Sequence, residues 1–301
     1  MEENGKIGMI LLTGYLGAGK TTMLNNLLQK PVIREKKIAL IINEFGSLGV
    51  DGALVKSDGA TKYELNKGSL FCICIKTDFI KTLKEISEEV KPELVLVEAT
   101  GVAETRDLLE FIDAPGLKEN FKVLANVCIV DALDLTKVLG MMKAAREQVK
   151  RADGIVINKV DLVEREDVDK LRDVIRSLNP DAPIIDTTYG MIPSDFIFDL
   201  EHEQISGEEI KEPPAAVFAA AFRTEKPVDR ERFMSVLDDF KENILRLKGC
   251  VDFGAGPGYF EVINGRISEK ETCPSGKNET AFSVIAWNIR ENDLKEAFSF
   301  I

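Results

Sequence analysis

The sequence contains little histidine and little cysteine. Its 301 residues include one histidine, His202, and five cysteines. One histidine leaves little material for a histidine-built metal cage or a Ser/His/Asp catalytic relay. The cysteines are odd in number and scattered apart from one close pair, unlike the dense, even frameworks of small secreted domains. We expect Cys128, Cys250 and Cys273 to be buried core residues.

The sequence also lacks an excess of positive charge and any long apolar run. There are 39 Lys and Arg against 51 Asp and Glu, a formal net charge of -12. A nucleic acid or an anionic membrane is therefore not expected as a main partner. The N-terminal residues carry acids where a secretory signal has a basic region, and no run approaches the roughly 18 apolar residues of a membrane-spanning helix. A cytoplasmic protein is the natural expectation.

The length suggests two domains, and the first two-thirds of the chain show a repeated pattern. Short apolar runs begin at Met9, Ile38, Leu94, Val127 and Ile155. Such runs are typical of strands buried on both faces, and segments with helical spacing, such as 168–178, lie between several of them. Strands alternating with helices predict an α/β fold over residues 1–198, with a mostly parallel sheet flanked by helices.

The texture changes after residue 198. Residues 199–214 read DLEHEQISGEEIKEPP, which is acidic, poor in apolar residues and closed by two prolines, so a linker is predicted. Strand-like runs then begin at Val217, Tyr259 and Phe282, and helical spacing is seen from Phe233 to Ile244 and from Leu294 to Ile301. These patterns predict a smaller α+β domain at 215–301.

A phosphate-binding pattern follows the first predicted strand. GYLGAGKT, from Gly14 to Thr21, matches G-x-x-x-x-G-K-[ST] and opens a segment with helical spacing. Glycines allow the loop to curl so that successive N–H groups point at phosphate oxygens, and Lys20 would reach the β- and γ-phosphates. Thr21 would ligate Mg²⁺ and Thr22 would support the α-phosphate. The predicted phosphate-binding residues are Gly14, Gly17, Ala18, Gly19, Lys20, Thr21 and Thr22.

A second pattern, Asn158-Lys159-Val160-Asp161, indicates which base is bound. It follows a predicted strand of the same sheet. A carboxylate at Asp161 can accept hydrogen bonds from N1–H and the exocyclic amino group of guanine, and adenine offers no such donor pair on that edge. The stem of Lys159 can lie along the purine ring, and Asn158 can tie its loop to the phosphate loop. Together the two patterns predict binding of GTP and GDP.

The third element is ELVLVEATG. A predicted buried strand ends in Glu98, where P-loop proteins usually place an Asp that serves Mg²⁺, and Gly101 can offer its N–H to the γ-phosphate. We assign Lys20 and Glu98 catalytic roles in hydrolysis and Thr21 with Glu98 to Mg²⁺. Residue 102 is Val rather than a water-positioning Gln, so hydrolysis is expected to be slow without a partner or a metal.

With these patterns the sequence resembles the CobW-like GTPases, relatives of the urease and hydrogenase nickel-insertion GTPases. Residues 43–46, Asn-Glu-Phe-Gly, followed by Asp51, and ILRLKG near the C-terminus add to the resemblance. It implies a GTPase domain followed by a smaller α/β domain, and GTP-controlled delivery of a metal ion or servicing of a metal or corrinoid enzyme. A client metalloenzyme or corrinoid protein is thus the expected partner, and a homo-oligomer stays open.

The sequence departs from the family where the cargo metal is expected. The family has a Gly followed by Cys-x-Cys-Cys, whereas here Gly68 is followed by Ser-Leu-Phe-Cys-Ile-Cys-Ile, so only Cys72 and Cys74 are thiols. A carboxylate such as Glu44, a water molecule or a side chain of a partner would have to help them hold Zn²⁺, Co²⁺ or Ni²⁺. On an extended strand the two Cα atoms would lie about 6.5 Å apart, so the segment must bend to chelate. Burial of both cysteines in a core is the rival interpretation.

Two other functions are compatible with the patterns. A GTP-dependent conformational adaptor or reactivation factor would dock a partner enzyme without any metal cargo. A P-loop kinase acting on a small molecule is disfavoured, because such kinases do not need the Asn158-to-Asp161 pattern.

Overall fold

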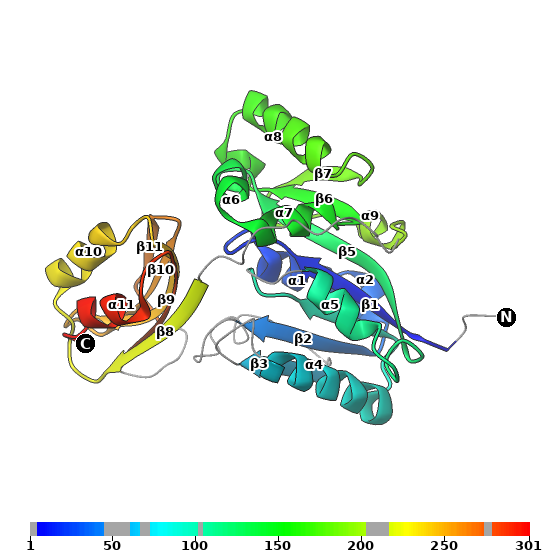
Figure 1. The fold of residues 1–301 in the computed structure, drawn as a ribbon, viewed down its shortest axis with the longest axis horizontal. Coiled ribbons are helices and arrows are strands. Elements are labelled where there is room, and N and C mark those ends of the chain that lie inside the picture. Colours follow the sequence, from blue (N-terminus) through cyan, green and yellow to red (C-terminus); the bar gives the residue numbers. More distant parts are fainter. Residues whose placement is uncertain (1–4, 45–60, 67–72, 102–104, 203–216, 274–278) are drawn as a thin grey trace. The chain divides into compact units, whose positions relative to one another are not determined.

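The computed structural model describes residues 5–44, 61–66, 73–101, 105–202, 217–273 and 279–301 (Figure 1). They fall into two compact units, one built on a parallel sheet and one on an antiparallel sheet. Within these ranges no helix has the length and apolar character needed to cross a membrane. Part of the predicted linker, residues 203–214, lies outside the described residues.

The first unit contains a seven-stranded sheet in the order β3-β2-β4-β1-β5-β6-β7. Six neighbouring strands of this sheet are joined by parallel pairing, in the order β2-β4-β1-β5-β6-β7. This pairing confirms the predicted α/β fold. The strands are β1 (Ile7–Thr13), β2 (Ile38–Glu44), β3 (Thr61–Asn66), β4 (Leu94–Glu98), β5 (Phe121–Asp131), β6 (Gly154–Asn158) and β7 (Ile184–Thr187). Because the paired strands run in one direction, their carboxyl ends share one edge of the sheet.

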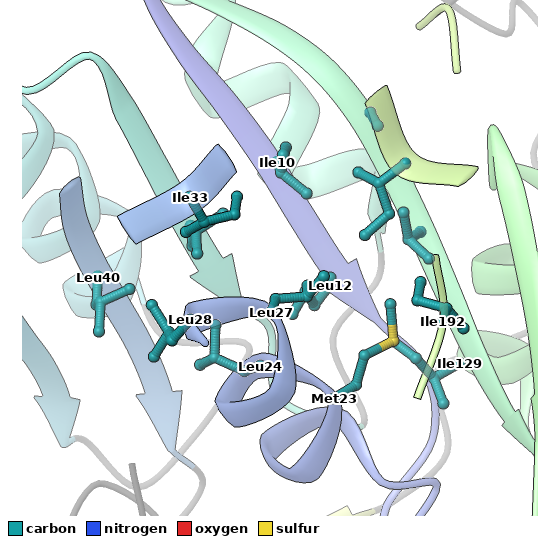
Figure 2. Packing of buried hydrophobic residues seen from close by; sticks show 14 of the residues in the cluster. Ile10, Leu12, Met23, Leu24, Leu27, Leu28, Ile33, Leu40, Ile129 and Ile192 are labelled. Atoms are coloured by element: carbon teal, nitrogen blue, oxygen red, sulfur yellow. The ribbon is translucent and has the colours of Figure 1, made fainter. Parts of the chain in front are cut away.

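Helices pack on both faces of this sheet, which explains the continuous apolar runs. Ile10 and Leu12 of β1 face the cluster that includes α1, shown in Figure 2, whereas Met9 and Leu11 face a second cluster that includes α4 and α5. The helices are α1 (Lys20–Leu28), α2 (Pro31–Arg34), α4 (Ile73–Glu85, continued by a π-helical turn at Ile86–Val90), α5 (Thr105–Ile112), α6 (Leu135–Met141), α7 (Lys143–Lys150), α8 (Arg165–Leu178) and α9 (Ser194–Phe198).

The second unit is a five-stranded antiparallel sheet in the order β11-β10-β9-β12-β8, with two helices, as predicted for the smaller domain. Phenylalanines at 233, 260, 282 and 298 form the centre of its core. The hairpin between β10 and β11 turns at Asn264 and Gly265, which both have positive φ. The elements are β8 (Val217–Thr224), α10 (Arg230–Asp239), β9 (Ile244–Asp252), β10 (Pro257–Ile263), β11 (Arg266–Lys270), β12 (Thr280–Trp287) and α11 (Glu291–Ala297).

The predicted C-terminal helices were too long. Helix α10 ends at Asp239, and Ile244 is the first residue of β9 instead of part of the helix. Ile244 still belongs to the core of this unit, but its side chain enters that core from strand β9 and not from a helix. An apolar residue at helical spacing was therefore misassigned because both elements bury side chains in the same core.

Two cysteines expected to be simple core residues form a disulfide. Cys250 of β9 is bonded to Cys273, which follows β11 and is only half-buried, and their Cα atoms are 5.6 Å apart. Burial was predicted correctly for Cys250 but not for Cys273, and the bond between them was not predicted because strands β9, β10 and β11 bring together residues that are 23 positions apart. Cys128, in contrast, is a free and buried thiol, as predicted.

Candidate functional site

The phosphate loop lies between the end of β1 and the start of α1, and its glycines are required by geometry. Gly14, Gly17 and Gly19 have φ of 131°, 75° and 104°, a region that side chains rarely adopt. A Cβ atom at Gly14 would lie 2.0 Å from the carbonyl oxygen of Ile129. A Cβ atom at Gly19 would lie 2.3 Å from Nδ2 of Asn158. The loop therefore packs directly against the ends of two neighbouring strands.

Lys20 lies inside this loop. Its side chain is buried, and Nζ donates to the carbonyl oxygens of Gly14 (2.9 Å) and Tyr15 (3.1 Å). Such contacts keep an ammonium group in the loop, where it is available to phosphate oxygens. Tyr15 is also buried, and this burial, with the nearby Asp134, raises the pKa of its phenol well above the usual range. Thr22, the last of the predicted phosphate-binding residues, is exposed.

The two residues predicted to serve Mg²⁺ are in direct contact. Thr21 Oγ1 donates to Glu98 Oε1 at 2.6 Å, and Glu98 is buried at the end of β4. A hydroxyl and a carboxylate are the hard oxygen ligands that Mg²⁺ prefers. The donor set therefore fits Mg²⁺. Gly101 approaches the phosphate loop closely, because a Cβ there would lie 2.5 Å from the backbone nitrogen of Leu16.

The predicted base-recognition residues are attached to the phosphate loop. Asn158 Nδ2 donates to the carbonyl oxygen of Ala18 at 2.8 Å. Lys159, with a positive φ of 65°, donates from Nζ to the carbonyl oxygen of Gly17 at 2.7 Å. Asp161 is exposed, in a short 3-10 turn at Val160–Leu162. The structure thus brings the two patterns together at one edge of the sheet.

Sequence reasoning missed two parts of this site. Asp131, the buried last residue of β5, accepts a hydrogen bond from Lys159 Nζ at 2.7 Å. The available signal was its place at the end of an apolar run, as for Glu98. The second missed part is the loop after β7, where the Gly190 N–H donates to Asn158 Oδ1 at 3.0 Å. No motif marked this loop.

Of the predicted cargo residues, the structure places only the backbones of Glu44 and Cys74. Cys72 lies outside the described residues; Glu44 is the last residue of β2 and Cys74 the second residue of α4. Since α4 begins at Ile73, the extended-strand geometry considered for the Cys72–Cys74 segment does not apply at Cys74. Among the described residues there is no group of three or more His, Cys, Asp or Glu that could hold a metal ion. His202 instead pairs with Asp153, with Nδ1 and Oδ2 2.7 Å apart.

A glycine-rich loop between a central parallel strand and a helix, with a Thr–Glu oxygen pair at its end, defines a P-loop nucleotide-binding protein. The chain belongs to one family of that class. The model described as "CobW/HypB/UreG, nucleotide-binding domain" matches residues 8–186, and "Cobalamin synthesis protein cobW C-terminal domain" matches residues 218–300. The resemblance noted from the motifs is thereby confirmed.

Curated relatives match along most of the chain. It is 29% identical to the zinc chaperone CobW of Sinorhizobium sp, covering 89% of this chain and 88% of the relative. It is 24% identical to the zinc chaperone YjiA of Escherichia coli, in a match that covers 97% of this chain and 98% of the relative. The crystal structure of the Zn(II)-bound YjiA GTPase has 20% identity, covers 98% of each chain and gives a TM-score of 0.51, which shows a shared fold.

Proposed function

We propose that this protein binds GTP, hydrolyses it to GDP and phosphate, and couples that cycle to the handling of a metal ion. The observation that carries the proposal is the attachment of Asn158 and Lys159 to the phosphate loop. Base recognition and phosphate binding then act on one ligand. Asp161, exposed beside them, supplies the carboxylate that reads guanine.

Hydrolysis follows from the phosphate side of the site. A water molecule attacks the γ-phosphate, while the ammonium of Lys20 and the loop N–H groups stabilise the charge that develops on its oxygens. Thr21 and Glu98 would hold Mg²⁺, which neutralises phosphate charge when bound. No glutamine follows Gly101 to position the water, since residue 102 is Val. The isolated protein should therefore turn over slowly.

The metal part of the proposal rests on the relatives, several of which are named zinc chaperones. Cys72, Cys74 and Glu44 are the proposed ligands for Zn²⁺, and Co²⁺ or Ni²⁺ are the other candidates. The client would be a metalloenzyme or a corrinoid protein in the cytoplasm. Thiolates suit Zn²⁺, which also accepts a carboxylate.

The test has two stages. First, GTP binding and phosphate release are measured for the wild type, Lys20→Ala and Glu98→Gln. We expect the wild type to bind GTP in preference to ATP, and both variants to lose hydrolysis by at least ten-fold. A wild type that prefers ATP would reject the nucleotide assignment. Release of about one phosphate per second or faster would reject slow intrinsic hydrolysis.

Second, Zn²⁺, Co²⁺ and Ni²⁺ are titrated into the wild type and into a Cys72→Ala/Cys74→Ala double variant, with GDP and with a GTP analogue. We expect tight, nucleotide-dependent binding that is lost in the double variant. Equal weak binding in all samples would reject a metal held by these thiols.

A second candidate is a GTP-dependent adaptor with no metal cargo. The sequence itself favours it, because either alignment with the family pattern lacks thiols. If Gly68 is aligned with the family Gly, Ser69 and Phe71 occupy thiol positions. If Cys72 and Cys74 are aligned with the Cys-x-Cys, Ile75 occupies the third thiol position. An adaptor would capture its partner in one nucleotide state even after both cysteines are replaced. Pull-downs with GDP and with a GTP analogue separate this function from metal delivery.

A further inference from the structure

The loop that follows β7 is held in place by residues of the nucleotide site. Thr187 ends β7 directly beside Asn158, its partner in the parallel register with β6. Residues 188–191 therefore begin at the same sheet edge as the base-recognition residues. Asn158 Oδ1 accepts the N–H of Gly190 at 3.0 Å, and Asn26 of α1 donates to the carbonyl oxygen of Tyr189 at 2.7 Å. One turn is thus tied both to the base motif and to the phosphate-loop helix.

Tyr189 occupies an unfavourable position in this turn. Its φ of 54° is in the left-handed region, which costs a non-glycine residue about 1 kcal/mol or more. Its side chain is 68% exposed, so little burial compensates that cost. Gly190, the next residue, packs its backbone on α1, since a Cβ there would lie 2.9 Å from Cα of Met23. Strain and aromatic exposure at a ligand-binding edge indicate a functional role for the ring.

We propose that Tyr189 is an additional nucleotide-binding residue, whose ring stacks on the face of the guanine base while Asp161 reads its edge. The inference rests on the proposed binding of GTP and GDP. Every purine has a similar π face, so a stacking ring adds affinity without selecting the base. Selection stays with Asp161. The two residues therefore make separable contributions, Tyr189 to the affinity for purine nucleotides and Asp161 to the choice among them.

The test compares GDP affinities, by titration calorimetry on the full chain, for the wild type, Tyr189→Ala, Tyr189→Gly and Tyr189→Phe. Loss of the ring should weaken GDP binding about ten-fold, a typical effect of aromatic–base stacking, and Tyr189→Phe should bind within two-fold of the wild type. The ratio of GDP to xanthosine diphosphate affinity should be unchanged in all three variants. Phe198→Ala removes another part-exposed aromatic of the same unit, 36% exposed, and should bind like the wild type.

Thermal unfolding without nucleotide distinguishes binding from a structural role. Tyr189→Gly relieves the positive φ, so its midpoint should equal or exceed that of the wild type although it binds GDP more weakly. Wild-type affinity in both the Ala and the Gly variants would overturn the stacking role and leave GTP binding intact. A wild type that does not bind GDP would instead overturn the proposed function.

Discussion

Single polar side chains link the two halves of the nucleotide site. Lys159 donates to Gly17 of the phosphate loop and to Asp131 at the end of β5. Asn158 bridges the carbonyl of Ala18 and the N–H of Gly190. These side chains are therefore occupied in holding loops, and Asp161, exposed next to them, is the group that we propose reads the base edge.

Replacing Asp161 with Asn should change base preference with little effect on folding. The amide offers a donor where the carboxylate accepts, which suits the C2 carbonyl of xanthine instead of the amino group of guanine. We expect Asp161→Asn to lose GTP affinity by at least ten-fold and to gain xanthosine triphosphate affinity, measured by equilibrium binding. Asp167→Asn, an exposed helix substitution, is the control. Unchanged GTP affinity in Asp161→Asn would contradict the assignment.

The buried thiol of Cys128 should be chemically inert in the folded protein. Burial raises its pKa from 9.0 to about 12, so the reactive thiolate is scarce at neutral pH. Because the pKa is raised by folding, the contribution of this thiol to the stability of the fold is fully present below pH 9. That contribution is lost as the pH rises from 9 toward 12. We expect mass spectrometry to find Cys128 unmodified by iodoacetamide at pH 8 until denaturant is added. Rapid alkylation under native conditions would disprove its burial.

The raised pKa of Cys128 also predicts a difference between the wild type and Cys128→Ala. Between pH 9 and pH 12, the free energy of unfolding should fall more steeply with pH for the wild type. The difference should be up to about 1.4 kcal/mol for each pH unit. Denaturant titrations at pH 8, 9 and 10 measure it.

At the scale of elements, the close approach of β4 to the phosphate loop depends on Gly101. A methyl group there would overlap the backbone of Leu16. We expect Gly101→Ala to push the loop away from Glu98 and to weaken GDP binding at least ten-fold while the protein stays folded, as judged by calorimetry and circular dichroism. Gly140→Ala is the matched control, since α6 offers open space there. It should be neutral or stabilising by up to about 1 kcal/mol.

The disulfide joins the edge of the second sheet to its centre. Its cysteines are 23 residues apart, and closing a loop of that length stabilises the folded state by about 3 kcal/mol in the chain-entropy model. Reduction should lower the unfolding midpoint of the second unit. Trp287, the one tryptophan of the chain, belongs to this unit and reports the transition by fluorescence. A Cys250→Ser/Cys273→Ser variant should match the reduced wild type and be insensitive to reductant.

Elements built from contiguous patterns were predictable, and those that depend on distant partners were not. The runs at β1, β2, β4, β5 and β6 identified the parallel sheet because strands buried on both faces are apolar throughout. The edge strand β3, TKYELN, carries no such run. In the site, the phosphate loop and residues 158–161 were recognisable because the residues of each motif follow one another in the sequence. The contact of Asp131, the role proposed for Tyr189 and the pairing of the two disulfide cysteines all depend on folding.

At the scale of the whole molecule, two units with separate cores should unfold in two steps. Each unit has its own buried apolar clusters. GDP at a hundred times its dissociation constant should stabilise the nucleotide-binding unit by about 2.7 kcal/mol. We expect far-ultraviolet circular dichroism to show two transitions, of which GDP shifts one, and Trp287 fluorescence to follow the other. A single transition seen by both probes would show that the units unfold cooperatively.

Strand β11, the fully exposed border of the second sheet, has a consequence for how the protein behaves at high concentration. A border strand carries backbone donors and acceptors that a strand from another molecule can pair with, which is one route to fibres. In β11 the sequence RISEK places Arg266, Glu269 and Lys270 along this border, and charges of this kind resist such pairing. Three of the five residues of β11 are charged, and this charge is what opposes pairing between molecules at the border.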